Sequence, residues 1–583
     1  MLKKSLLILS VILCFVFIVS CGENSTKINK TGDETNDSAD VSSDNEVENP
    51  DNDGTDTEPS EEDPDGGENQ EDPDENQENN DDPAEETSIV AEPSPDFDTK
   101  TEALIVTTEN FAEVFKKFAV FHTVTGIITK VVTVENICEN AVCDDDDPMN
   151  DTQKAIKDYV MSVEGLRYLV LGGDIEEIPS RKVHDHFELP LGIADYTDDF
   201  YSDLYYADFS NWDLNGNGTY AEDEDNPVLI ANVAVGRISV STIEEAELYF
   251  NKLVKHYTAF NTAHTTKSLL LANIATELSG IKVNSGYYFE TEGKTISQIP
   301  MNYSIKKLYT KSTPFPGGNT AQYLDNDTEK AAIEEGMNLI VHSGHGAPWL
   351  LTCEQGDDPD RDFDRNMAYD LKNTTLPFFL SCACEAGQFG YKNGDSAGEK
   401  LMNAPEGGAI VYLGNTTTGL GIAGGSQFID EMMKNMFAFP YSVIGESYIF
   451  AHLSMPQSDT FNPPIQMVNI NVPVVNKDSW TWTKKSIVML GDPMTVFWRD
   501  PVEPLAAEFT VETAENDEGK TVSLHFPPEL EGATLRVFAG GLLYDIPCIM
   551  HETVKITTDP SVETMTVGIK AENSQYFFKE FEI

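Results

Sequence analysis

Two stretches that each join an apolar run to small residues set the expected fold: NLIVHSGHGAPW (residues 338–349) and LPFFLSCACEAGQFG (residues 376–390). Both runs have strand length, and their apolar residues are continuous rather than alternating. Strands of a parallel sheet have this pattern because helices cover both faces of the sheet. The pair therefore predicts two buried strands that deliver His345 and Cys384 to one edge of a sheet.

Strand-like runs alternate with helical patterns on both sides of this pair. The first set comprises ALIVTT (103–108), a helical pattern at 110–126, ITKVVTV (128–134), a helical pattern at 152–165 and YLVLGGD (168–174). The second set includes SLLLANIA (268–275) and GAIVYLG (408–414). Such alternation is typical of α/β layers. We predict an α/β body over residues 99–500, built as two subdomains that divide near residue 265.

Beyond residue 500 the pattern changes to short alternating strands separated by turn signals. FTVETA (509–514), TVSLHF (521–526), TLRVFAG (534–540) and MTVGIKA (565–571) illustrate it. This pattern predicts a small β-sandwich over residues 501–583.

The first twenty residues have the features of a secretory signal, namely two lysines, an apolar run and small residues. The run ends IVSCG (18–22), which resembles the lipobox of bacterial lipoproteins. By that resemblance residues 1–20 are a lipoprotein signal peptide and Cys21 becomes the lipidated N-terminus. An uncleaved membrane anchor is the alternative. Either way we expect an exported protein that is tethered to a membrane of the bacterial cell envelope.

Residues 21–98 are predicted to form a disordered acidic linker. Residues 22–98 hold 29 acidic residues and two lysines, so they contribute −27 to the formal net charge of −62. A segment of this composition has too little apolar surface to fold. The remaining −35 lies on the rest of the chain, so nucleic acid is not expected as a partner.

The eight cysteines do not have the spacing of a disulfide scaffold. Cys138 and Cys143 are close enough to bridge a loop in an oxidising compartment. Cys384 follows the apolar run LPFFLS, which we expect to lie beside the run NLIVHS that precedes His345. A thiol nucleophile needs a base and donors for the developing oxyanion. Spacing alone is weak support, since many proteins have a Gly-His-Gly turn or a cysteine at a strand end.

Several motifs, in order, resemble the gingipain family of caspase-like cysteine peptidases. They include GHG after an apolar strand, a strand ending A-C-x-x-G-x-F, YLVLGGDIEEIPSR (168–181), VAVGRISVSTIEEAELYFNKLVKHY (233–257) and VMLGDPMTVFW (488–498). The likeness spans Glu102 to Trp498. It implies a caspase/gingipain-like parallel-sheet catalytic body, followed by a small all-β immunoglobulin-like domain.

The same resemblance assigns roles to residues. The nucleophile is Cys384 and the catalytic histidine is His345, while the backbone N–H groups of Gly346 and Cys384 are the oxyanion donors. Glu277 matches the glutamate that orients the histidine. The function implied is that of an exported, lipid-anchored cysteine endopeptidase, which cleaves protein or peptide substrates through an acyl-enzyme and needs no organic cofactor.

The neighbouring thiol and histidine, and the site as a whole, have alternative interpretations. Cys382 is expected to be a buried core thiol and His342 a packed histidine. A zinc site built from Cys382, Cys384, His342 and His345 lacks the ligand spacing of known zinc motifs. The alternative function is a catalytically silent surface adhesin or binding protein on a peptidase-like scaffold. The presence of both His345 and Cys384 favours the enzyme.

Residues 213–224, DLNGNGTYAEDE, fit the calcium-loop pattern D-x-[DN]-x-[DN]-G-x5-E. Asp213, Asn215 and Asn217 would supply oxygens from positions 1, 3 and 5, and Glu224 a bidentate carboxylate. We predict a structural calcium site; an acidic turn without metal is the alternative.

Substrate preference is predicted from the stretch after Glu277. Arginine-cutting members of the resembled family carry an acidic residue shortly after this strand, because a buried cation needs a counter-charge. Here Tyr287, Tyr288 and Phe289 occupy that place, and Glu290 is the nearest carboxylate. A non-basic residue before the cleaved bond is therefore expected.

Overall fold

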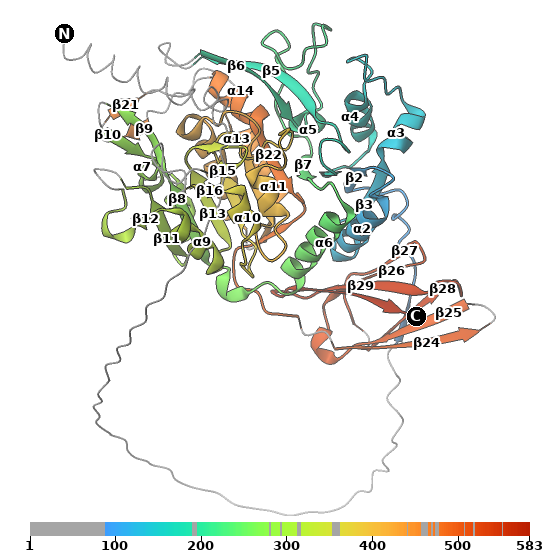
Figure 1. Ribbon diagram of the computed structural model, residues 1–583. Coiled ribbons are helices and arrows are strands. Elements are labelled where there is room, and N and C mark those ends of the chain that lie inside the picture. Colours follow the sequence, from blue (N-terminus) through green and yellow to red (C-terminus); the bar gives the residue numbers. More distant parts are fainter. Residues whose placement is uncertain are drawn as a thin grey trace, which may run out of the picture. The chain divides into compact units, whose positions relative to one another are not determined.

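An eleven-stranded sheet organises the body of the chain (Figure 1). The computed structural model describes residues 88–583, except 189–194, 279–280, 292–293, 312–315, 352–361, 440, 456–464, 468–469, 473–476, 506–507, 517–518 and 551. In spatial order the strands are β12 (Gln322–Tyr323), β11 (Ser304–Tyr309), β8 (Lys267–Ala272), β13 (Leu339–Ser343), β17 (Phe378–Ser381), β18 (Val411–Asn415), β22 (Ile487–Gly491), β7 (Ala234–Ile238), β4 (Tyr168–Gly172), β2 (Ala103–Thr107) and β3 (Thr129–Thr133). The predicted α/β class is confirmed.

The sheet is mixed rather than purely parallel. Within the described strands, β18 and β22 pair antiparallel, and each other neighbouring pair is parallel. The strands before residue 265 therefore run opposite to β8, β13, β17 and β18, and β22 joins the two halves. The strands β2, β4, β13, β17, β18 and β22 are buried at each residue, as continuous apolar runs require.

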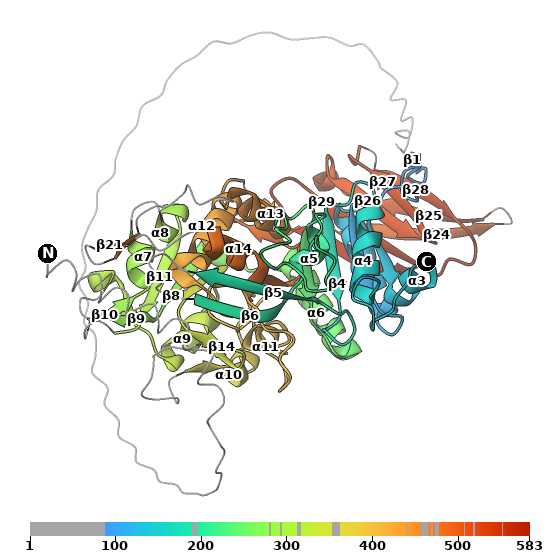
Figure 2. The ribbon, with the colours of Figure 1, turned by 90° about the horizontal axis from the view of Figure 1, so that it is seen from above.

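Helices cover both faces of this sheet. Figure 2 shows α12 (Gly425–Met436), α13 (Ile444–Ser454) and α14 (Lys477–Ser486) on one side, and α9 (Asn326–Glu334), α10 (Arg365–Tyr369) and α11 (Ala397–Met402) on the other. The other α-helices of the described residues are α2 (Ala112–Thr125), α3 (Val134–Asn140), α4 (Thr152–Ser162), α5 (Leu204–Ala207), α6 (Ile243–Thr258), α7 (Gly286–Glu290) and α8 (Thr295–Gln298). Within the described residues, no helix is both long and apolar enough to cross a bilayer.

Several short strands pair with one another outside the large sheet. They are β5 (Arg181–Glu188) with β6 (Asp195–Ser202), β9 (Ile274–Leu278) with β10 (Ile281–Asn284), β14 (Gly346–Ala347) with β15 (Leu350–Leu351) and β16 (Phe363–Asp364), β19 (Tyr441–Val443) with β23 (Val496–Trp498), and β20 (Ile465–Met467) with β21 (Ile470–Val472). The hairpin β5–β6 and the small sheet around β14 both border the site described below.

The C-terminal region forms two four-stranded sheets around a shared apolar core. One sheet has the order β1 (Ser88–Ala91), β28 (Thr553–Thr558), β25 (Gly519–His525) and β24 (Thr510–Asn516). The other has the order β27 (Leu542–Ile546), β26 (Thr534–Ala539), β29 (Thr564–Lys570) and β30 (Tyr576–Glu582).

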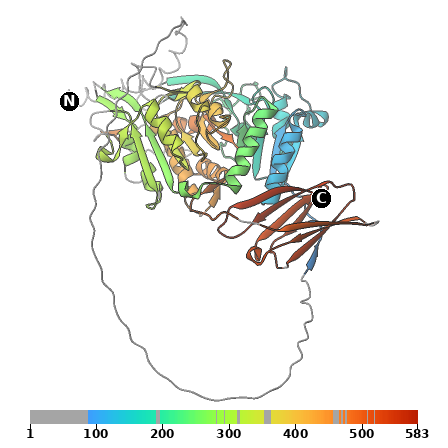
Figure 3. The ribbon, with the colours of Figure 1, turned by 60° about the horizontal axis from the view of Figure 1, so that its bottom comes forward.

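Strand β1 comes from the other end of the described chain. It pairs parallel with β28, and Figure 3 shows this blue strand beside the red ones. The predicted linker over residues 21–98 is therefore wrong in its last residues. The reason is local, since SIVA is apolar and partly β-branched, and both Ala91 and Phe97 are buried. The rest of the linker lies outside the described residues.

Candidate active site

The loops that carry the predicted catalytic residues leave the sheet side by side. Strands β13 and β17 are parallel neighbours, with His342 opposite Ser381 at their ends. His345 follows β13 by two residues and Cys384 follows β17 by three. Because parallel strands in register end at one edge, the two loops begin next to each other. His345 is 9% exposed and Cys384 is 4% exposed.

The two loops approach each other closely at Gly346. A Cβ atom at position 346 would lie 2.7 Å from the carbonyl oxygen of Cys384, 2.8 Å from Cβ of Ala383 and 3.4 Å from the backbone nitrogen of Cys384. Only glycine leaves room for so close an approach. The backbone after the histidine is thereby held against the backbone of the cysteine.

The end of β18 and the loop after it, residues 415–419, contact the cysteine loop from the other side. Asn415 Nδ2 donates to the carbonyl oxygen of Ala383 at 2.9 Å, and the thiol of Cys384 lies 3.7 Å from the carbonyl oxygen of Gly419. The carbonyl oxygen of Thr417 accepts from the N–H of Glu385 at 2.8 Å. The sequence reasoning missed these residues, although NTTTG follows the next parallel strand and so belongs to the same edge.

Glu385, directly after the cysteine, has a strained backbone. Its φ is 55°, in the left-handed region that costs a non-glycine residue roughly 1–2 kcal/mol. Its N–H bonds to Thr417, and its carbonyl oxygen accepts from Gln388 N at 2.9 Å. The hydrogen bonds on both sides of Glu385 hold the turn that presents Cys384, and strain of this kind gathers at functional sites.

The hairpin β5–β6 reaches this edge from the first half of the chain (Figure 2). Thr416 Oγ1 donates to the carbonyl oxygen of Tyr201 at 2.7 Å, and Thr417 Oγ1 donates to Asp198. Burial raises the pKa of Tyr196, a hydrogen bond with Thr418 lowers it, and the negative charges of Asp198, Glu385 and Cys384 raise it. Tyr196 and Asp198 therefore border the cysteine.

Similarity to known proteins now identifies the family. The profile of peptidase family C25 matches residues 96–498, more than half of the chain. The chain belongs to peptidase family C25. It is a cysteine peptidase, which confirms the resemblance to the gingipain family. No curated protein sequence matches it.

Solved structures agree in fold. The peptidase resembles the complex of the pro- and mature domains of RgpB from Porphyromonas gingivalis, at 17% identity and a TM-score of 0.51, over 82% of this chain and 99% of that one. It also resembles the Arg-specific cysteine proteinase gingipain R, at 15% identity and a TM-score of 0.51, over 83% of this chain and 98% of that one.

The neighbouring thiol and histidine of the peptidase are packed in the sheet. Cys382 is buried, with its Sγ 3.4 Å from Ser343 Oγ and 3.6 Å from Ser426 Oγ, and burial raises its pKa. His342 Nδ1 contacts Ser381 Oγ at 3.0 Å and Nε2 contacts Asn273 Oδ1 at 2.8 Å. Burial, assisted by repulsion from His345, lowers the pKa of His342 to about 3. Both ring nitrogens of His342 have hydrogen-bond partners, which disfavours the zinc alternative.

Glu277 lies in β9, opposite Lys282 of β10, and its side chain is outside the described part of the structure. Cys353 and Cys21 also fall outside the described residues. Cys138 and Cys143 form a disulfide, whereas Cys548 is an exposed free thiol.

The predicted calcium loop adopts a tight turn around Asp213. Asp213 Oδ1 accepts from Asn217 N at 3.0 Å, and Oδ2 accepts from Gly218 N at 3.0 Å. Glu224 is exposed, whereas Asp225 is buried, and its Oδ1 accepts from Leu214 N at 2.8 Å. Asp225 Oδ2 is buried without a hydrogen-bond partner in the described structure. Over the described residues, no group of three or more His, Cys, Asp or Glu side chains is placed to hold a metal.

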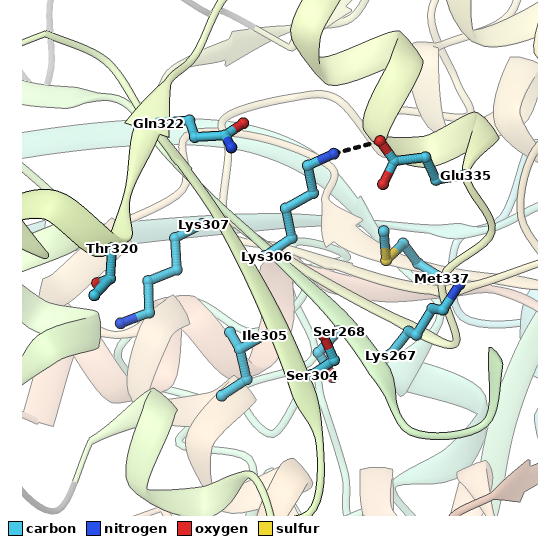
Figure 4. A pocket seen from close by; sticks show the side chains of 10 residues that line it. All are labelled: Lys267, Ser268, Ser304, Ile305, Lys306, Lys307, Thr320, Gln322, Glu335 and Met337. Carbon is cyan, nitrogen blue, oxygen red and sulfur yellow. Dashed lines mark hydrogen bonds and ion pairs between the residues drawn. The ribbon is translucent and has the colours of Figure 1, made fainter. Parts of the chain in front are cut away.

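A cavity of about 320 Å³ lies away from Cys384, at the edge formed by β11 and β12 (Figure 4). Three lysines line it, and Lys306 pairs with Glu335 at 2.5 Å, while Lys307 pairs with Glu290 at 2.9 Å. Lys306 and Lys307 lie on β11 and Lys267 lies on β8, and the first two are neutralised by these ion pairs. We assign this cavity no part in the chemistry.

Proposed function

We propose that the peptidase is an exported, lipid-anchored cysteine endopeptidase that uses Cys384 and His345. The thiolate of Cys384 attacks the scissile carbonyl, and His345 protonates the leaving amine as the C–N bond breaks. The resulting thioester is then hydrolysed by water. The observation that carries this proposal is the contact of Gly346 with the Cys384 backbone, because it brings both strand ends to one point.

The oxyanion of the tetrahedral intermediate would be bound by the N–H groups of Gly346 and Cys384. The short separation between these two backbone segments supports this assignment. Glu277 is proposed to orient His345, on the family resemblance alone.

Digestion of a peptide library by the full chain tests the proposal. We expect cleavage by the wild type, and none by Cys384→Ala or His345→Ala with unchanged melting temperatures. Cleavage by Cys384→Ala would refute the assigned nucleophile, and a folded, inactive wild type would favour a silent binding protein.

A non-basic residue before the cleaved bond is proposed for this peptidase. Glu290 Oε1 accepts from Lys307 Nζ at 2.9 Å and from the Tyr309 hydroxyl at 2.9 Å, so its charge is already compensated. Tyr288 is buried, and its hydroxyl donates to Asp430 Oδ2 at 2.7 Å. Within the described residues of this segment, the one carboxylate that follows the aromatic residues, Glu290, is already paired, which supports an uncharged preference.

A structural calcium ion is proposed for the loop of residues 213–225. The side-chain oxygens of Asp213, Asn215 and Asn217 would hold it, closed by Glu224 as the motif has it or by the buried Asp225. The unpartnered Asp225 Oδ2 supports a bound cation, since a buried carboxylate oxygen without a donor is costly. Calcium would cross-link the loop and take no part in peptide cleavage.

The anchor is proposed to be a lipid on Cys21, after removal of residues 1–20, with the body outside the cytoplasm. The formal net charge of −62 argues against nucleic acid as a partner. Protein substrates are proposed from the peptidase family, and the membrane tether from the resemblance of residues 18–22 to a lipobox.

A further inference from the structure

One hydroxyl in the core of the peptidase lies between two carboxyl groups. Ser239 Oγ, directly after β7, is 3.0 Å from Asp174 Oδ1 and 2.7 Å from Glu399 Oε1. A serine hydroxyl has one proton and can donate it to one acceptor. The second contact would then join two acceptors, unless one carboxyl group is protonated. The geometry therefore requires one bound proton in this trio.

The proton belongs on Glu399. Asp174 also accepts from Ile175 N at 2.7 Å and from Ser241 Oγ at 3.1 Å, and it lines a cavity of about 270 Å³. Glu399 is 2% exposed, and Ser396 N donates to its Oε2 at 2.7 Å. Asp174 thus has two further hydrogen-bond donors and lies beside the cavity, whereas burial favours the neutral form of Glu399. The donor chain thus runs from the Glu399 carboxyl to Ser239 and on to Asp174.

Glu399 stands in the first turn of α11, which holds both catalytic loops. Ser396 Oγ accepts from Glu399 N at 3.3 Å and completes a capping box. The N–H groups of the first two residues of α11 donate to the active-site loops. Ala397 N donates to Pro348 O at 2.7 Å, and Gly398 N donates to Ala386 O at 2.8 Å. Pro348 follows His345 by three residues, and Ala386 follows Cys384 by two.

We propose that Glu399 is a positioning residue that has to stay protonated for the loops of His345 and Cys384 to keep their places. Its ionisation sets the buried carboxylate of Glu399 and the half-buried carboxylate of Asp174 against one hydroxyl and loosens the first turn of α11, so activity falls at alkaline pH through a group that touches no substrate. The inference rests on the proposed catalytic roles of Cys384 and His345.

The surroundings of Glu399 agree with a retained proton. Burial first, and then the charge of Asp174, raise the pKa of Glu399 to about 8. Asp395 adds to this, but Lys400 pairs with it at 2.6 Å. The other charged groups around the cavity, Asp174 and the first turn of α11 include Glu176, Glu177, Arg237, Arg365 and Lys392. Arg237 is paired with Asp203 at 2.8 Å, which leaves Asp174 as the main charge acting on Glu399.

The sign of the linkage is fixed by the raised pKa. Between the ordinary glutamate pKa of about 4.3 and the folded value, the native protein keeps a proton that the unfolded chain has lost. Stability therefore falls as pH rises through this window, to about pH 8, and this contribution is level on either side.

Glu399→Gln is the matched test, because glutamine copies the protonated acid. Its oxygen accepts from Ser396 N and its amide donates to Ser239 Oγ, at any pH. Glu406→Gln, which removes an exposed carboxylate just after α11, is the control. With the full chain, we expect the melting temperature of Glu399→Gln minus that of wild type to grow from pH 5 to about pH 8 and then level off. Glu406→Gln should track wild type.

Activity gives the second readout. The kcat/KM ratio of Glu399→Gln to wild type should rise about tenfold from pH 7 to pH 9, because one unit above the pKa about a tenth of the acid remains protonated. Titration of Cys384 and His345 cancels in this ratio. Asp174→Asn removes the neighbouring charge and should partly flatten the dependence of kcat/KM on pH that wild type shows. This variant replaces Glu399→Gln in the test if Glu399→Gln does not fold.

Three results would overturn the proposal. A melting-temperature difference that does not vary with pH would mean that no proton is held. If the pH dependence of the melting-temperature difference disappears in EDTA, a cation rather than a proton lies between the carboxylates. If the melting temperatures behave as expected but the kcat/KM ratio of Glu399→Gln to wild type does not change with pH, the proton has no positioning role. If no variant cleaves any peptide, the proposed function fails, while the melting series still decides the proton.

Discussion

The two thiols on either side of Ala383 can be separated by one pair of substitutions. Cys384→Ala removes the proposed nucleophile, and Cys382→Ala removes a sulfur two residues earlier. Cys548 is an exposed free thiol, so both variants are best made with Cys548→Ser to avoid labelling there.

The structure sets the expected size of each effect. Cys382 is 1% exposed and its sulfur lies 3.4 Å from Ser343 Oγ, so its removal leaves a small cavity. We expect a loss of about 1–2 kcal/mol in the free energy of unfolding for Cys382→Ala, with activity close to that of wild type. Removing a catalytic nucleophile costs at least about 10⁴-fold in kcat, so Cys384→Ala should be inactive. Its stability should change less, since its thiol makes a weak 3.7 Å contact with Gly419 O.

Three assays read these outcomes independently. Hydrolysis of a quenched peptide, selected from the library digest, measures activity, and chemical denaturation measures stability. A peptidyl chloromethyl ketone followed by peptide mapping shows which sulfur reacts. Label on Cys382, or an active Cys384→Ala with an inactive Cys382→Ala, would refute the assignment and shift the registration onto the family by two residues. Full activity in both variants would refute the cysteine mechanism for this pair.

The other predictions test calcium, the anchor and specificity. Chelation should lower the melting temperature, since a ligand at a hundredfold excess over its Kd stabilises the folded protein by about 2.7 kcal/mol. Substitution of the carboxylate that closes the loop, Asp225→Asn or Glu224→Gln, should abolish this sensitivity to chelation. A melting curve that chelation leaves unchanged would refute the metal. Cys21→Ser should abolish fatty-acid labelling, and persistent label would contradict the anchor. Library cleavage should not require Arg or Lys before the cut; strict basic cleavage that is lost in Glu290→Gln would identify Glu290 as the acid after all.

The sheet and the edge that carries the site were predictable because burial on both faces leaves a visible pattern. NLIVHS and LPFFLS are continuous apolar runs, and β13 and β17 are indeed adjacent. The direction of β22 was not predictable, because IVMLG is apolar throughout and would look the same in a parallel or an antiparallel position.

Residues that act through their backbone or from distant segments also left little trace in the sequence. Thr417 and Gly419 hold the cysteine loop with carbonyl oxygens, which any residue type has. Tyr196 and Asp198 come from a hairpin some 190 residues earlier than Cys384, and no local spacing connects them. Asp225 is buried and Glu224 is exposed, and the sequence of two adjacent acids does not reveal which of them is buried.

The reversed direction of β22 explains how the two halves of the sheet support one site. Because β22 runs antiparallel to β18, it begins where β18 ends. Ser486, just before β22, accepts from Thr416 N through its carbonyl oxygen at 2.9 Å and donates from Oγ to Asn415 Oδ1 at 3.2 Å. Asn415 Nδ2 in turn donates to Ala383 O at 2.9 Å, beside Cys384. A parallel β22 would begin at the other edge of the sheet, and this chain of hydrogen bonds to the cysteine loop would not form.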